Sequence, residues 1–328
     1  MSAALRRVAA VRELPVALAL ALMIGITGSA NHAFLGRQGV RDILVGVSVV
    51  ALLAVGQSFV IVMRHVDLSI GSTVGLSAYL VGHYLATHEG HGLPVAMAIG
   101  LMVGVAVGAL NGALVGFLKL PSLVVTLGTL YLVRGLSNQV VAGDVITADK
   151  LPSALHRLGS SAIFGVPYLF LIVVVAAVAA TVAMRALRPF RDLFAMGSNP
   201  TAAGLVGIPV ARRTFGAFVL CGAVTGLAGT LLLARFNAAD ANSGLGIELN
   251  VVAACVVGGV AIAGGVGTAA GAVLGALLLQ SITLALGALG VSQFWQQAVN
   301  GTLLIVAIAL DRLIAMRTVT HRTIRAIA

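Results

Sequence analysis

The sequence predicts an all-α integral membrane protein with about ten transmembrane helices. Of its 328 residues, 59% are hydrophobic and 9% are charged, and the mean hydropathy is +1.09. So few polar side chains cannot cover a water-soluble globule of this size. The apolar residues fall into runs of about the 20 residues that a helix needs to cross a bilayer, where unpaired backbone polar groups are costly.

We expect one transmembrane domain over 1–328, with spans at roughly 14–30, 43–63, 69–87, 93–118, 121–141, 166–187, 214–234, 249–266, 268–289 and 294–311. The first run follows a charged start and therefore also has the pattern of a signal peptide. We interpret it as a retained first span, because nine further runs follow and can direct insertion themselves. No carboxylate lies in the middle of a run.

The distribution of Lys and Arg predicts the orientation of the spans. One set of connections and ends holds fourteen of these residues: Arg6, Arg7, Arg12, Arg64, Lys119, Arg185, Arg188, Arg191, Arg212, Arg213, Arg312, Arg317, Arg322 and Arg325. The other set holds five: Arg37, Arg41, Lys150, Arg157 and Arg235. By the positive-inside rule, both termini should be cytoplasmic in a plasma (inner) membrane protein.

A faint internal repeat indicates an architecture of two halves. "GVAVGALNGALVG" from Gly104 aligns with "GTAAGAVLGALLL" from Gly267, in the fourth and ninth spans. Segments five spans apart run in opposite directions, so the pattern predicts an inverted repeat of five plus five, which is common in transporters. The alternative is chance similarity between two helices rich in glycine and alanine.

A polar stretch at 186–214, "ALRPFRDLFAMGSNPTAAGLVGIPVARRT", interrupts this apolar chain. Ser198 or Asn199 can cap a short helix, Pro200 suits its first turn, and the sequence from Gly207 ends it. Such a helix is too short to span a bilayer and is marginal without a packing partner. It is either an ordinary connection between spans or a docking helix for a soluble protein.

Four sequence blocks resemble one family of membrane proteins. "GSNPTAAGLVGI" looks like the cytoplasmic coupling loop of permease subunits of bacterial ATP-binding-cassette (ABC) sugar importers of the ribose, xylose, rhamnose and autoinducer-2 type. "RHVDLSIGSTVGLSA", "LPSLVVTLGTLYLVRG" and "SGLGIELNVVAACVVGGVAIAGGVGTAAGAVLGALL" are similar to three more signature blocks. The chain departs from many relatives at Arg64 and His65, where a glycine pair is common, and at Thr201, where an acidic residue is frequent.

The resemblance implies a transport subunit for a small sugar or sugar-like molecule, not an enzyme. Two permeases, identical or homologous, would form the pathway, two ATPase subunits would bind the coupling loop, and an extracytoplasmic binding protein would deliver the substrate. ATP and Mg²⁺ would be bound by the ATPase, and this chain, which has no GxxxxGK[ST] loop, would bind no cofactor. The candidate coupling residues are Ser198, Asn199, Ala202, Ala203, Gly204 and Gly207.

The candidate pathway and gate residues are polar groups on or near the spans: Asp67, Asn111, Thr126, Arg134, Glu248, Asn250 and Trp295. Asp67 either caps the third span through the N–H of Ser69 or Ile70, or takes part in a gate, for example with Arg64. Arg134 either faces a polar partner within the membrane or extends to its outer surface. Glu248 and Asn250 either cap the eighth span or form part of the extracellular mouth. The remaining polar residues either contact substrate or bridge helices.

Other classes of function fit the sequence less well. An ion-gradient-driven secondary carrier, the main alternative, usually needs an ion-coordinating group in the middle of the membrane. An intramembrane enzyme would need a motif such as HExxH, which the sequence lacks. Cys221 and Cys255 are expected to be buried packing residues, and His83, His88 and His91 not to bind metal. The net charge of +10 comes without the aromatic interleaving of a nucleic-acid surface.

Overall fold

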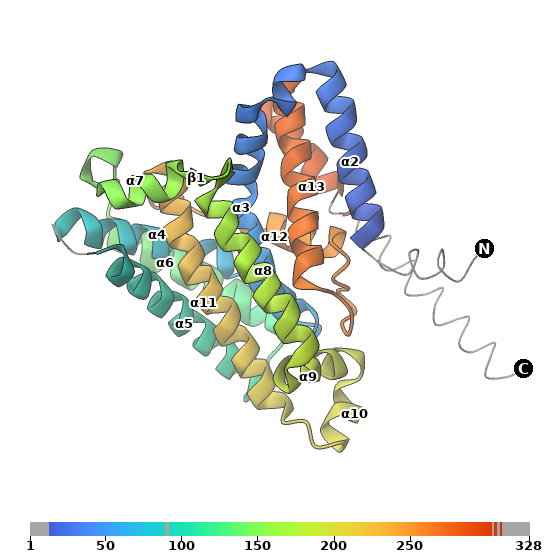
Figure 1. The fold of residues 1–328 in the computed structure, drawn as a ribbon. Helices are drawn as coiled ribbons and strands as arrows, with labels where there is room; N and C mark the ends of the chain where they lie inside the picture. Colours follow the sequence, from blue (N-terminus) through green and yellow to red (C-terminus); the bar gives the residue numbers. More distant parts are fainter. Residues whose placement is uncertain (1–12, 89–91, 304, 307–308, 310–328) are drawn as a thin grey trace, which may run out of the picture.

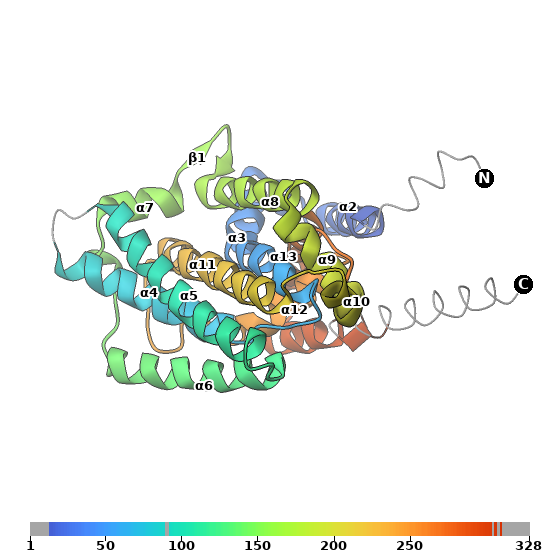
Figure 2. The same ribbon diagram turned by 90° about the horizontal axis from the view of Figure 1, so that it is seen from below.

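A computed structural model describes residues 13–88, 92–303, 305–306 and 309 as a bundle of helices (Figures 1 and 2). The long helices are α2 (Glu13–Ala30), α3 (Arg37–Ile61), α4 (Ile70–Thr87), α5 (Leu93–Gly116), α6 (Ser122–Val141), α8 (Tyr168–Ala186), α11 (Val210–Phe236) and α13 (Ala269–Ala288). Shorter helices are α7 (Ser153–Ser160), α9 (Arg188–Ser198), α10 (Pro200–Leu205) and α12 (Ile247–Val257). Within the described residues, five helices are long and apolar enough to cross a membrane: α3, α5, α8, α11 and α13.

The bundle has two ends, at which different connections gather. At one, which we call the α7 end, α7 lies beside a two-stranded hairpin of β1 (Ala162–Ile163) and β2 (Val166–Pro167), and Arg41 near the start of α3 donates to the carbonyl of Ser160 at 2.5 Å. At the other, the α10 end, α9 and α10 connect α8 to α11 (Figure 1). Short 3₁₀ turns, η1 (His32–Leu35) and η2 (Ala148–Lys150), complete the connections.

The two predicted groups of basic residues occupy opposite ends. Arg64, Lys119, Arg185 and Arg212 lie at or just beyond helix ends at the α10 end. Arg37, Lys150 and Arg235 lie at helix ends and connections of the α7 end. The terminal arginines at 6–12 and 312–325 and the predicted location of both termini lie outside the described residues.

Glycines let α5 and α11 pack with their backbones in contact. Along α5 they recur at every fourth position: Gly100, Gly104, Gly108, Gly112 and Gly116. A Cβ atom on Gly104 would overlap the carbonyl oxygen of Gly222 on α11, and a Cβ on Gly222 would overlap that of Gly104. Small residues spaced four apart lie on one face of a helix and permit close packing within a membrane. This stripe therefore fixes the antiparallel α5–α11 pair.

The core forms around α3, against which α8, α11, α12 and α13 pack (Figure 2). Every residue from Val47 to Ile61 is buried except the half-buried Val50, so nearly the whole circumference of α3 contacts protein. A helix apolar on all sides is typical of such a central position. Cys221 and Cys255 are free and buried in this core, as expected.

Most predicted spans agree with the observed helices to within a few residues. The start of α3 is a correction, because the helix begins at Arg37 and includes a polar first turn in which Gln38 donates to Asp42 at 2.8 Å. The last predicted span corresponds to a helix over 293–303, and its remainder to 311 lies partly outside the described residues. Each predicted span thus contains a helix, and within the described residues five of these helices reach the length and hydropathy of a membrane span.

The predicted span at 249–266 is wrong over its second half. The helix α12 ends at Val257, and the chain continues to Gly267 as an irregular loop. Gly259, Gly264, Gly265 and Gly267 all have positive φ, between 75° and 147°, which an α-helix cannot accommodate. The apolar composition of this segment therefore reflects a partly buried loop that returns to the α10 end.

Candidate functional site

The 186–214 segment contains two helices, where the sequence predicted one. The unpredicted helix, α9, buries Asp192, Leu193 and Met196, and Asp192 accepts a hydrogen bond from Arg213 Nε at 2.8 Å. This ion pair joins α9 to the first turn of α11. The predicted short helix is α10: Asn199 Oδ1 accepts from the N–H of Ala202 at 3.0 Å, and the cap is confirmed.

The two sides of α10 differ in exposure. Ala203 is only 3% exposed and packs into the core, whereas Leu205 and Val206 are 84% and 76% exposed. Ser198, Asn199, Ala202, Gly204 and Gly207 are also exposed. Leu205 and Val206 thus form an exposed aliphatic surface beside small residues. The Ala203 side chain cannot belong to that surface, because it is turned into this chain.

Arg64 connects α9 to the loop between α3 and α4. Its Nε donates to the carbonyl of Gly197 and its Nη2 to that of Ser198 at 2.7 Å. These carbonyls lie at the C-terminus of α9, where a positive charge is favourable. The alternative in which Arg64 pairs with Asp67 is not observed, since the guanidinium donates to the 186–214 segment instead.

The loop after α12 closes the same junction. Gly265 donates its N–H to the carbonyl of Val62 at 2.8 Å. A Cβ on Gly197 would overlap both the Val62 carbonyl and the Gly265 nitrogen. Three segments distant in sequence therefore meet at the α10 end: the 62–66 loop, the turn at 197–199, and the 258–267 loop.

A cavity of about 810 Å³ opens beside this junction. Its lining includes Arg64, His65 and Lys119 together with Pro200 and Thr201 of α10, and it includes no carboxylate. Burial lowers the pKa of His65, so its imidazole tends to be neutral and the positive charge comes from Arg64 and Lys119.

Asp67 lies in a buried polar cluster just before α4. Its Oδ1 accepts from the N–H of Ser69 at 2.9 Å, which confirms the predicted contact, and from the Ser69 hydroxyl at 2.6 Å. Asn111 of α5 donates to the Ser69 hydroxyl oxygen at 2.9 Å, and Thr126 of α6 donates to the Val66 carbonyl at 3.2 Å. The cluster thus fixes the loop before α4 against both α5 and α6.

Arg134 contacts the loop between α11 and α12. Its Nη1 donates to the carbonyls of Ala241 at 2.8 Å and Ser243 at 3.0 Å, in the loop between α11 and α12. Glu248 lies in the first turn of α12, as expected, and its carboxylate packs against Gly71 of α4. Asn250 and Trp295 are exposed and are not brought into these clusters.

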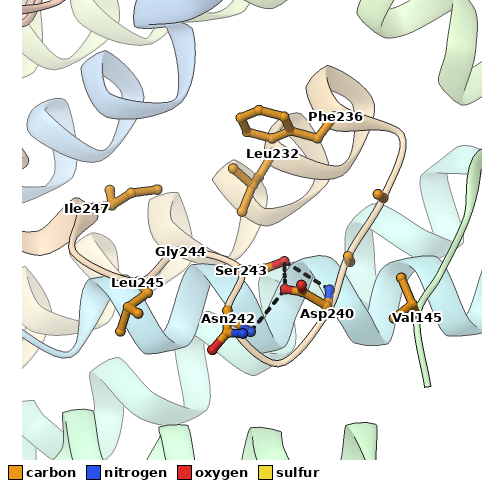
Figure 3. Close-up of a pocket in the computed structure, with 11 residues that line it drawn as sticks. Val145, Leu232, Phe236, Asp240, Asn242, Ser243, Gly244, Leu245 and Ile247 are labelled. Atoms are coloured by element: carbon orange, nitrogen blue, oxygen red, sulfur yellow. Dashed lines mark hydrogen bonds between the residues drawn. The ribbon is translucent and has the colours of Figure 1, made fainter. Parts of the chain in front are cut away.

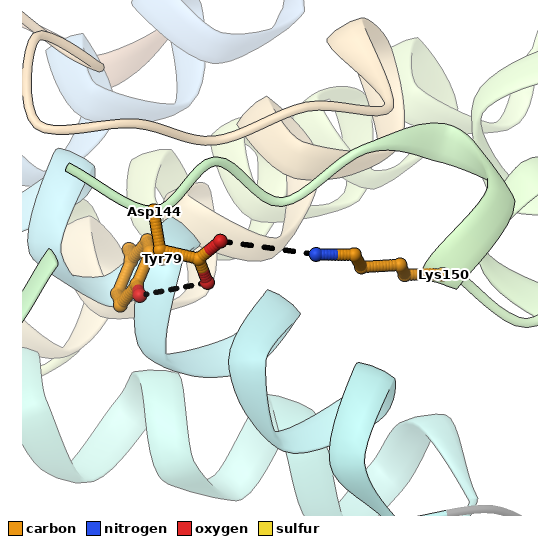
Figure 4. A network of polar contacts seen from close by, with 3 residues as sticks. All are labelled: Tyr79, Asp144 and Lys150. Atoms are coloured by element: carbon orange, nitrogen blue, oxygen red, sulfur yellow. Dashed lines mark hydrogen bonds and ion pairs between the residues drawn. The ribbon is translucent and has the colours of Figure 1, made fainter.

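A polar contact at the α7 end fixes the loop after α6 (Figure 4). Tyr79 of α4 donates to Asp144 Oδ2 at 3.5 Å, and Lys150 Nζ lies 3.8 Å from Asp144 Oδ1. Both charged side chains are about half exposed, so the ion pair contributes little to stability but orients the loop.

The loop at 236–247 carries polar residues that the sequence analysis did not select. Asp240, Asn242 and Ser243 line a cavity of about 440 Å³ at the α7 end. The signal was available in the sequence, as "NAADANSG" is the most polar stretch between two long apolar runs after 214. The sequence of this stretch predicts a turn, and the fold shows that the turn borders a cavity.

Comparison with known families identifies the chain. Residues 39–308 match the family described as "Branched-chain amino acid transport system / permease component". The chain belongs to this permease family. The match covers both polar clusters and the whole 186–214 segment.

Curated relatives cover nearly the whole chain. The protein named "Autoinducer 2 import system permease protein LsrC" from Enterobacter sp. (strain 638) is 34% identical over 95% of this chain and 90% of its own length. Those from Escherichia coli O9:H4 (strain HS) and Salmonella paratyphi B are 33% and 32% identical, each over 92% of this chain and 86% of their own lengths. No solved structure matches. The expected resemblance to ABC importer permeases is confirmed, and the chain is a multi-pass membrane transport subunit.

Proposed function

We propose that this chain forms the transmembrane pathway by which an ABC importer takes up a small sugar or sugar-like molecule, of the class to which autoinducer 2 belongs. The observation that carries the proposal is the match to permeases over 39–308 together with the names of the relatives. ATP and Mg²⁺ would be held by a separate ATPase subunit, and an extracytoplasmic protein would deliver the substrate. A second permease copy or a homologous permease would complete the pathway.

The α10 end would be cytoplasmic, and the ATPase would dock on the exposed side of α10 formed by Leu205 and Val206. The junction at Arg64 supports this role, since it joins the 197–199 turn before α10 to the loop that carries Asp67. Ser198, Asn199, Ala202, Gly204 and Gly207 would shape this docking site, and the buried Ala203 would anchor α10 to the core.

Ten spans and a five-plus-five inverted repeat remain part of the proposal. Helices α2 to α6 correspond in order to α8, α11, α12, α13 and the helix over 293–303. In this correspondence α5 matches α13 and α3 matches α11. The contact of α5 with α11 therefore has a counterpart in the contact of α13 with α3. Glycines mediate helix packing in both aligned segments, at Gly104 against α11 and at Gly275 against α12. Both termini would then be cytoplasmic.

Reconstitution separates the importer from an ion-gradient-driven carrier. Proteoliposomes would contain this chain, its ATPase and any companion permease, with binding protein outside and ATP inside. We expect substrate to accumulate after ionophores collapse all ion gradients, and accumulation to be lost without the ATPase. Gradient-driven accumulation by this chain alone would contradict the proposal.

A further inference from the structure

The cavity at 236–247 has two chemically different sides (Figure 3). Leu232, Phe236 and Ile247 form an apolar side, and Asp240, Asn242 and Ser243 form a polar one. Its volume of about 440 Å³ is within the range of small-ligand sites, which combine apolar walls with a few polar groups. A sugar ring has the matching character, with C–H faces and a rim of hydroxyl groups.

The polar side of the cavity is fixed before any ligand binds. Asp240 Oδ1 accepts from the N–H of Asn242 at 3.0 Å and from the Ser243 hydroxyl at 3.1 Å. Arg134 of α6 also fixes the loop, because it donates hydrogen bonds to the carbonyls of Ala241 and Ser243. Reciprocal backbone hydrogen bonds between Ile146 and Ala239, at 2.9 and 3.1 Å, join the loop to the one after α6. Such preorganisation reduces the entropic cost of binding.

Hydrogen-bonding capacity remains for a ligand. A carboxylate offers about four acceptor sites, and the bonds within the loop use Oδ1 of Asp240. Asn242 is exposed at the cavity and has an amide that donates and accepts. On the apolar side, Phe236 is 58% exposed, and the Arg235 guanidinium lies 4.6 Å from its ring centroid. Arg235 itself donates to the Gly46 carbonyl at 2.7 Å, so the aromatic ring is held in place.

We propose that this cavity, the 236–247 pocket, is a subsite that binds a sugar-like molecule during its passage. Asp240 and Asn242 bind hydroxyl groups, and Phe236 covers a C–H face of the ring. The inference rests on the proposed function, in which the α7 end faces the extracytoplasmic side and receives substrate from the binding protein. It adds a permease site for the substrate itself, with named contacts.

Cysteine protection tests occupancy of the pocket. Leu245 lines the pocket and is 67% exposed, so Leu245→Cys, in a chain with Cys221→Ala and Cys255→Ala, offers a reactive thiol at its rim. The assembled importer in proteoliposomes is treated with a membrane-impermeant maleimide, with and without D-ribose or autoinducer 2 as probes. We expect either probe to slow modification several-fold. Phe164→Cys, at the tip of the hairpin and outside the pocket, is the matched control and should react at an unchanged rate.

The outcomes separate the subsite from the proposed function. The subsite alone would be overturned if neither probe changed the rate at which the maleimide modifies Leu245→Cys, in an importer that still accumulates substrate with ATP. Failure of the reagent to reach either thiol from the outside would overturn the orientation on which both proposals depend.

Paired carboxylate variants test the named contact. Asp240→Asn keeps an Oδ1 acceptor for the loop but removes the charge, and we expect about tenfold more probe to be needed for the same protection. Asp149→Asn is the control, because Asp149 lies outside the pocket at the same end. The hydrogen bond from Thr147 lowers the pKa of Asp149, so this control also removes a full negative charge. Equal protection in the two variants would remove Asp240 from the site.

Discussion

Arg64 joins the segment proposed to meet the ATPase to the loop that carries Asp67. Its backbone has a φ of 70°, a conformation that costs a non-glycine residue about 1–2 kcal/mol. The two hydrogen bonds to the carbonyls of Gly197 and Ser198 offset this cost. We call these two hydrogen bonds the Arg64 clamp. A glycine at this position would relieve the backbone strain but could not form the clamp.

Replacing Arg64 should uncouple the importer more than it destabilises it. In Arg64→Ala, we expect ATP-driven uptake to fall about tenfold, because the variant loses charge-assisted hydrogen bonds. The ATPase should remain bound. Uptake and ATP hydrolysis are measured together in proteoliposomes. Arg188→Ala, which removes an exposed arginine of α9, is the control. Wild-type uptake per ATP in Arg64→Ala would show that the clamp has no part in coupling.

At this scale the sequence predicts local contacts and misses distant ones. The contact of Asp67 with Ser69 and the cap at Asn199 were predictable because donor and acceptor lie two or three residues apart. The partners of Arg64 lie more than 130 residues away, and no local pattern identifies them. Ala203 looked like part of a docking surface because small residues suit close approach, but its partner is this chain's own core.

The glycine stripe of α5 should determine the stability of the α5–α11 pair. Gly104→Val places a side chain where the Gly222 carbonyl lies, and the helices must separate. We expect overpacking to cost about 1–3 kcal/mol or more, measured as a lower midpoint of thermal unfolding in detergent. Gly128→Ala of α6 is the control, because a Cβ there meets no atom within 4 Å. Equal midpoints for the two variants would contradict close packing at Gly104.

The exposed side of α10 gives a test of ATPase docking. Leu205→Glu puts a carboxylate at the centre of the proposed contact, where burial without a partner is unfavourable. Because Leu205 is 84% exposed, the permease itself should fold normally. We expect loss of co-purifying ATPase, and no such loss for Phe164→Glu at the α7 end. Retention of the ATPase and of uptake in Leu205→Glu would leave α10 as an ordinary connection.

The elements of the fold were predictable where hydrophobic length decides them. The bounds of α4, α5, α6, α8 and α13 agree with apolar runs because a bilayer requires continuous helix. The end of α12 was not predictable in this way, since residues 258–266 are apolar but bend at glycines with positive φ. Likewise, α9 was not predicted, because its N-cap residue Leu187 makes no side-chain cap hydrogen bond, whereas Asn199 caps α10.

The whole molecule separates its polar chemistry between two ends. The α7 end holds the 236–247 pocket and the Asp144 contact, and the α10 end holds the junction at Arg64 and the larger cavity. Between them, the Asp67 and Arg134 clusters are linked through the first turn of α4, where Arg134 Nη2 lies 3.5 Å from the Gly71 carbonyl. This contact joins the Arg134 cluster to the start of α4, close to the Asp67 cluster.

Orientation in the membrane decides which end meets which partner. Single cysteines at Ser160 and Ser198, in a chain with both native cysteines replaced by alanine, report the two ends, and both positions are exposed. Because Lys and Arg are concentrated toward the α10 end, we expect an impermeant maleimide to label Ser160→Cys in intact cells and Ser198→Cys only after the membrane is opened. Labelling after permeabilisation controls for thiol reactivity. External labelling of Ser198→Cys would invert the molecule, placing α10 beyond the reach of a cytoplasmic ATPase and the 236–247 pocket beyond that of an extracytoplasmic binding protein.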